Sequence, residues 1–386
     1  ANTTGASNTA MGGNTLDANT TGSNNTAVGY VALGANTTGA DNVAVGALAG
    51  DALTTGSDNV VVGKNALSAD TLGRRSVAIG RSALSAQNFT STTSSYNVAV
   101  GYEAGAAVTT GVENTIVGGL AGDAITTGSS NIAVGYQALT TDTKGSRSVA
   151  VGFSALRFQA NTSAVETYNV AVGHAAGEAV TTGLQNTIIG GLSGDAITTG
   201  SNNTTLGYAA LSENTTASNN TAVGHRALVA NTTGAQNTAV GANAGFALTT
   251  GSNNTAFGFE ALKNEDAHGN NTAIGTQALF AQNAGADAYN TAVGYQAGAA
   301  VTTGVQNTFI GGLAGDANTT GNENTAVGYA SLSANTTAAG NTAMGWLAMA
   351  ATTTGYANVA MGLSALGGQT TGNQNVAIGH QSLDAL

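Results

Sequence analysis

A pentapeptide repeated at an almost constant spacing is the feature that most constrains the fold of this chain. Clear copies cover residues 8–12, 25–29 and 42–46, which read NTAMG, NTAVG and NVAVG. There are 22 copies; of the 21 intervals between their closing glycines, 18 are 17 residues, two are 21 and one is 19. A fixed short period indicates that each repeat is one coil of a solenoid stacked on its neighbours.

The repeat runs from end to end of the 386 residues. We therefore expect one continuous repeat domain over 1–386, although this length alone would suggest two or three domains. A formal net charge of −11 at pH 7, with only 8% charged residues, disfavours nucleic acid as a partner. No apolar run reaches 18 residues, so we expect no membrane insertion.

The pentapeptide itself reads as a short β-strand that is apolar on both faces. Position two is always β-branched, position three is nearly always Ala, and position four is always large and apolar. Alternate strand residues face opposite sides, so positions two and four share one face. One face is expected to line the coil, and the other must be covered by another copy of the chain. Representative residues for the core or the contact between chains are Val28, Val45, Ile79, Val134, Val223 and Ile310.

The rest of each coil is expected to hold a second short strand and a turn. The second segment, such as residues 30–33, carries a small Ala followed by Leu or by Gly. The turn reads NTTG at residues 19–22 and 36–39, which suits local side-chain hydrogen bonding and left-handed backbone. Asn opens 20 of the 22 pentapeptides and should form an amide ladder along the stack. With coils about 4.8 Å apart, the sequence predicts a rod on the order of 100 Å long.

The unit resembles the head repeats of trimeric autotransporter adhesins, most closely in SVAIG at 76–80 and SVAVG at 148–152. GYQAL at 135–139 is also similar to repeat shafts of phage tail-fibre-type proteins. The adhesin likeness implies a left-handed parallel β-roll that forms a homotrimer about a common axis. The period of 17 is longer than the roughly 14-residue adhesin-head repeat, which implies a larger outer turn.

The three lengthened repeats are the places where the chain departs from its rhythm, with longer loops near 85–97, 157–169 and 279–290. Extra residues in a solenoid form loops on one face, often the binding face. The alternative is an inherited duplication, because 102–139, 174–211 and 295–332 are closely similar. Candidate partner contacts in or near these loops are Phe89, Tyr96, Phe158, Tyr168, Phe280, Tyr289, Arg81 and Arg157.

Nothing in the sequence predicts an enzyme, a cofactor or a metal site. His174 and His225 are three coils apart, about 14 Å, which is too far to share an ion. The residues after the closing glycines, which include many aromatics, are expected to form an outer stripe that covers the coil edge or contacts a partner. The aspartates that follow the Gly of the second segment are read as turn residues; they are Asp51, Asp123, Asp195 and Asp316.

We therefore expect an extracellular homotrimeric fibre, an adhesin head or a tail-fibre shaft at a cell surface or on a virion, which could engage a host-cell glycan or surface receptor by avidity. One alternative is an ice- or surface-binding solenoid, because the Thr-Thr turns form a regular Thr ladder. The breaks at 80–101 and 152–173 argue against one flat face for that alternative. Another alternative is an end-to-end filament, since uncapped coil edges are prone to pair.

Overall fold

Each pentapeptide forms one three-residue strand, and the strands of consecutive coils pair in parallel. The computed structural model describes residues 2–384, in which all regular elements are strands. These residues form no helix and therefore none long and apolar enough to cross a membrane. The expected all-β parallel solenoid, with about 22 turns and a 17-residue period, is confirmed.

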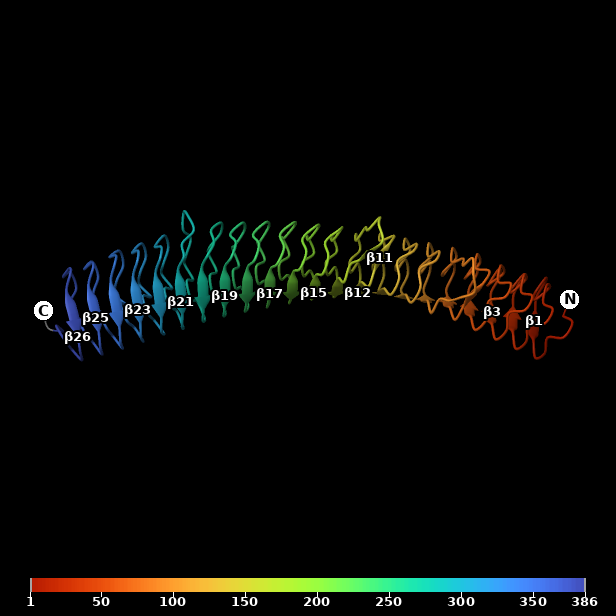
Figure 1. Ribbon diagram of the computed structural model, residues 1–386, viewed down its shortest axis with the longest axis horizontal. Coiled ribbons are helices and arrows are strands. Elements are labelled where there is room, and N and C mark those ends of the chain that lie inside the picture. The colour runs from red at the N-terminus through yellow and green to blue at the C-terminus, as the bar shows by residue number, and fades with distance from the viewer. Residues whose placement is uncertain (1, 385–386) are drawn as a thin grey trace. The chain divides into compact units, whose positions relative to one another are not determined.

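Contacts divide the chain into two compact units, residues 1–199 and 200–386, each with eleven strands of the main sheet. Within each unit, the strand of one coil lies beside the strand of the next (Figure 1). The first unit holds β1 (Thr9–Met11), β2 (Thr26–Val28), β3 (Val43–Val45), β4 (Val60–Val62), β6 (Val77–Ile79), β8 (Val98–Val100), β9 (Thr115–Val117), β10 (Ile132–Val134), β12 (Val149–Val151), β14 (Val170–Val172) and β15 (Thr187–Ile189). The second unit holds β16 (Thr204–Leu206), β17 (Thr221–Val223), β18 (Thr238–Val240), β19 (Thr255–Phe257), β20 (Thr272–Ile274), β21 (Thr291–Val293), β22 (Thr308–Ile310), β23 (Thr325–Val327), β24 (Thr342–Met344), β25 (Val359–Met361) and β26 (Val376–Ile378).

The pairing register follows the repeat, so that each pentapeptide position lies beside the same position of the next coil. Thr26 pairs with Val43 and Val28 with Val45. The lengthened coils keep this register: β6 pairs with β8, β12 with β14 and β20 with β21, all in step. Their extra residues are accommodated outside the main sheet.

Position three faces the inside of the coil. Ala27 and Ala44 are fully buried, as are Ala32 and Leu33 of the second segment. Small side chains fit at position three because the coil is thin. The backbone segments on opposite sides of its interior leave little space between them.

The second segment is not a strand, which corrects the sequence prediction. Val31 and Leu33 have left-handed backbone, with φ of 60° and 49°. This conformation costs about 1–2 kcal/mol per residue. It lets the chain bond both neighbours, because Val31 N donates to Gly13 O at 2.9 Å and Leu33 N to Ala49 O at 3.1 Å. Stacking therefore offsets the local strain.

The two types of second segment are alternative ways of filling one interior. Gly50 has φ of 57° where the equivalent Leu33 has 49°, and Leu53 then occupies the place of Asn36. Where two Gly-type coils are adjacent, a large residue at position three fills the remaining space. A Cβ on Gly122 would lie 3.3 Å from Cδ1 of Ile116. The same arrangement recurs at Ile188 and Phe309.

The Asn ladder is confirmed, and all of its asparagines except Asn8 and Asn375 are buried. Asn42 N donates to Asn25 Oδ1 at 3.1 Å, and Asn42 Nδ2 donates to Gly56 O at 2.9 Å. Both bonds tie an Asn side chain to the coil that follows it. Gly29 closes its pentapeptide with φ of 134°, and a Cβ there would lie only 2.5 Å from Gly46 O. The column of closing glycines is required by this close backbone stacking.

Candidate functional site

The outer sheet face, defined as positions two and four of the main-sheet strands, carries β-branched and large apolar side chains that are partly exposed. Val45 and Ile310 are about 40% exposed (38% and 40%), whereas Ala44 and Phe309, at position three of the same strands, are fully buried. The other representative residues are half-buried on the same face: Val28, Ile79, Val134 and Val223. These six residues are therefore not part of the coil core. They form a surface that the single chain leaves open.

Residues after the closing glycines form an exposed aromatic column along one edge, as the sequence predicts. Tyr136, Phe153 and His174 stack on consecutive coils, with ring centroids 5.6 and 5.2 Å apart. Some coils have Gly after the closing glycine, and there the Tyr ring of the following coil covers the Gly. At Gly119, for example, an added Cβ would lie 3.6 Å from the Tyr136 ring. The outward rings provide flat amphipathic contact area.

The first two lengthened coils each add a small two-stranded sheet. It consists of β5 (Gly73–Arg74) with β7 (Thr93–Ser94) in one coil, and β11 (Gly145–Ser146) with β13 (Val165–Glu166) in the other. Arg75 donates to the Tyr96 hydroxyl at 2.6 Å, and Arg147 makes the equivalent bond to Tyr168. Arg147 also pairs with Glu166 at 2.7 Å, beside a shallow open pocket that reaches Ser129.

Most of the predicted partner contacts lie at the surface. Tyr96, Tyr168, Tyr289, Phe158 and Arg81 are exposed, whereas Phe280 and Arg157 are half-buried. Six of the eight predicted residues belong to five cation–π pairs, in which the cation lies 4.9–5.5 Å from the ring centroid: Arg75 with Tyr96, Arg81 with Tyr102, Arg147 with Tyr168, Arg157 with Phe158, and Lys263 with Phe280.

Phe89 is the exception, because its side chain is only 5% exposed. It lies at the start of the first long loop, where its backbone N–H approaches the buried Asp70 carboxylate at 3.4 Å. The proposal of Phe89 as a partner contact is therefore wrong. Its ring is already buried within the single chain.

A buried polar network at the lengthened coils was not predicted from the sequence. In the first, Gln87 Nε2 donates to Asp70 Oδ2 at 2.6 Å and to Ser76 Oγ at 2.8 Å. Gln87 Oε1 accepts from Asn97 Nδ2 at 2.9 Å, so the Asn ladder is rejoined across the extra residues. The second lengthened coil repeats these contacts with Asp142, Gln159, Ser148 and Asn169. One sequence signal could have revealed this network. The first position of the turn, which is Asn in the NTTG turns, is acidic in the coil before each long loop.

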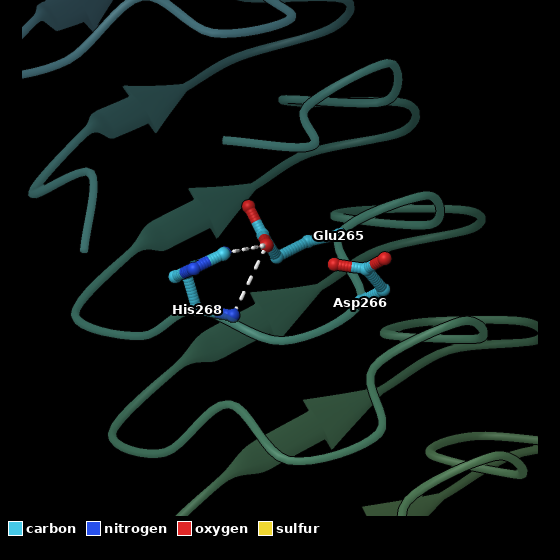
Figure 2. Close-up of side chains that lie close together, drawn as sticks. All are labelled: Glu265, Asp266 and His268. Carbon is cyan, nitrogen blue, oxygen red and sulfur yellow. Dashed lines mark hydrogen bonds and ion pairs between the residues drawn. The ribbon is translucent and has the colours of Figure 1, made fainter. Parts of the chain in front are cut away.

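The third lengthened coil follows a fully buried carboxylate, Glu265, which lies near Asp266 and His268 (Figure 2). The imidazole Nδ1 of His268 is 3.6 Å from Oε1 of Glu265. Burial raises the pKa of Glu265. Within residues 2–384, this is the one group of three or more His, Cys, Asp or Glu side chains close enough to share an ion.

The aspartates of the Gly-type coils form a dispersed acidic series. Their Oδ1 atoms are buried without a hydrogen-bond partner in the described part of the chain. Burial raises the pKa of all four carboxyls, Asp51, Asp123, Asp195 and Asp316. They are half-buried turn residues, one to a coil, and do not converge on a common point.

Comparison with known proteins gives no relative from which a role could be carried over. No protein-family description matches this chain, and no curated protein matches it.

Proposed function

We propose that this chain is the repeat region of an extracellular homotrimeric fibre, serving as an adhesin head or a tail-fibre shaft. The observation that carries the proposal is the outer sheet face. Every main-sheet strand places a large apolar side chain at position four on this face, and no strand residue there is charged. Natural sheets usually protect exposed surfaces and edges with charges. Their absence favours a face that is covered by another copy of the chain.

The size of the face supports an interface. Eleven strands spaced by about 4.8 Å, each contributing three residues of about 3.3 Å, give roughly 500 Å² in each unit. This is at the upper end of the apolar patches found on monomeric proteins. The face also extends over consecutive coils in unbroken register, so a partner with the same repeat would match it coil by coil.

Resemblance to trimeric adhesin heads and tail-fibre shafts favours three copies and an extracellular setting. Three copies would present the aromatic column and the long loops three times, so weak contacts to a host-cell glycan or surface receptor would add by avidity. The exposed Arg81 and the Phe158 ring would be candidate contacts.

A second candidate is binding to ice or another crystal surface. In the second unit, the nine consecutive strands β16–β24 all have Thr at position two, which gives a regular column of hydroxyl and methyl groups. The turn Thr ladder favours it less, because Thr37 Oγ1 already donates to Thr54 O at 3.0 Å in the next coil. Thermal hysteresis in concentrated protein would support this candidate, and its absence would exclude it.

A third candidate is an end-to-end filament. Parallel pairing in register, as between β25 and β26, is a geometry that a strand of another chain can continue. Electron microscopy distinguishes this candidate, since filaments that lengthen with concentration would support it and discrete particles would exclude it.

The homotrimer is tested by measuring the solution mass with light scattering. The mass should be three times that of the chain and should fall to one chain when position four is made acidic. A folded wild-type monomer would contradict the proposal.

A further inference from the structure

The Glu265 site differs from the two equivalent sites in one respect that points to a ligand. Asp70, Asp142 and Glu265 occupy the same turn place, and all three are fully buried. The carboxylates of Asp70 and Asp142 each accept a short hydrogen bond from the glutamine of the following coil. These two buried charges therefore have a strong donor within the fold.

Glu265 lacks the corresponding donor. Gln282 is the equivalent glutamine, but its Nε2 donates to Asn271 Oδ1 at 3.0 Å instead. The Glu265 oxygens receive two backbone N–H groups, from His268 at 3.2 Å and from Ala284 at 3.4 Å. Both bonds are longer than the usual range for charge-assisted hydrogen bonds. A buried carboxylate held this weakly carries an uncompensated cost.

The residues around Glu265 depart from the repeat in a matching way. The turn normally reads Asn-Thr-Thr-Gly, but here it reads Glu265-Asp266-Ala267-His268. A carboxylate thus replaces the first Thr, and an imidazole replaces the Gly. The Nδ1 atom of His268 is enclosed and has no hydrogen-bond partner among the described residues.

Distances in the group suit a shared ion better than a direct bond. The 3.6 Å between His268 Nδ1 and Glu265 Oε1 is too long for a hydrogen bond. Two ligands of one tetrahedral ion, with metal–ligand bonds of about 2.1 Å, lie about 3.4 Å apart. One donor atom from each of Glu265, Asp266 and His268 lies within 4.8 Å of the others. Figure 2 shows the His268 ring facing the Glu265 carboxylate, with Asp266 from the same turn beside them.

We propose that Glu265, Asp266 and His268 bind one Zn²⁺ ion per chain. An imidazole nitrogen with two carboxylates is a donor set that zinc accepts, with water in the fourth position. The ion compensates the buried Glu265 charge, as the glutamine amides do at Asp70 and Asp142. Ca²⁺ does not fit, because it requires six to eight oxygen ligands.

The test uses titration calorimetry of the full chain with ZnCl₂, and with CaCl₂ as the comparison. Wild type should bind one Zn²⁺ per chain, melt at a higher temperature with zinc, and show neither effect with calcium. D266T and H268G restore the repeat's own turn residues, so both variants should fold. Each should weaken zinc affinity by about tenfold or more.

The control is His225→Ala, since His225 is another histidine of this unit, stacked on Tyr208 away from the turn. This variant should keep wild-type zinc affinity. The proposal is overturned if wild type binds no zinc, or if binding survives H268G and is lost in H225A. An unchanged melting temperature with zinc in wild type, the result expected of a simple His268–Glu265 ion pair, would also overturn it.

Discussion

Adjacent residues of β10 face opposite sides of the sheet, so the same substitution at each should have different consequences. Ala133 is fully buried inside the coil, whereas Val134 is half-buried on the outer sheet face. Ala133→Asp places a carboxylate in a close-packed interior, which costs more than about 4 kcal/mol and should unfold the surrounding coils. Val134→Asp leaves the carboxylate in water in a single chain, and should cost that chain no more than about 1 kcal/mol.

Assembly changes the cost at Val134. If the outer sheet face is buried between chains, each unpaired carboxylate introduced by Val134→Asp costs about 3–5 kcal/mol, or roughly 9–15 kcal/mol for a trimer. The association constant should then fall by about six orders of magnitude or more. Light scattering should show a folded monomer, with far-ultraviolet circular dichroism close to wild type. Val134→Ile, which places at this site the residue found at Ile79, should assemble normally. The reasoning fails if Val134→Asp assembles like wild type, or if it unfolds like Ala133→Asp.

Three further predictions concern stability, each read as a change in melting temperature or denaturant midpoint. Gly118→Ala should destabilise the fold by at least about 2 kcal/mol, because φ of Gly118 is 137° and the added Cβ would meet Gly135 O at 2.4 Å. Gly119→Ala, at the neighbouring residue, adds a Cβ that meets only the Tyr136 ring at 3.6 Å, so it should cost under about 1 kcal/mol. Equal costs at the two glycines would be evidence against close stacking. Asn59→Ala should cost about 2–4 kcal/mol, since it removes bonds to Gly73 O at 3.1 Å and from Ser76 N at 2.9 Å in a buried setting, and a cost near zero would rule out the ladder as a stabilising element. Burial raises the folded-state pKa of four carboxyls above the unfolded value, so the folded state binds their protons more readily and stability should rise as pH falls from neutral towards their ordinary pKa of 3.8. The rise in stability should be smaller when these four aspartates are changed to Asn: Asp51, Asp123, Asp195 and Asp316. An identical pH dependence of stability in wild type and variant would refute this prediction.

The repeat predicts the fold well because its information is redundant. Equal spacing fixes the parallel pairing and register, and Asn at position one fixes the ladder, as seen at Asn42. The face that turns inward could not be predicted, because both faces are apolar. The thinness of the coil decides it, since small residues such as Ala44 fit between backbone layers, and larger ones such as Ile116 enter position three where neighbouring second segments have Gly.

The second segment was mispredicted because Val and Leu normally avoid left-handed backbone. The only hint in the sequence is that Gly50 stands at the repeat position that Leu33 occupies one coil earlier. Gly is common where the backbone is left-handed, and both residues do have left-handed backbone. The buried acids were missed for another reason. Asp70 looks like an ordinary turn residue, and its partner Gln87 lies 17 residues later, so their contact depends on the stacking of coils.

The solution mass of the wild-type chain tests the central claim most directly. The outer sheet face should hold chains of this sequence together, so light scattering should give three times 37.4 kDa at all concentrations above the dissociation constant. A stable, folded species of 37.4 kDa over the same concentrations would show that the face remains open to solvent, and would contradict the account.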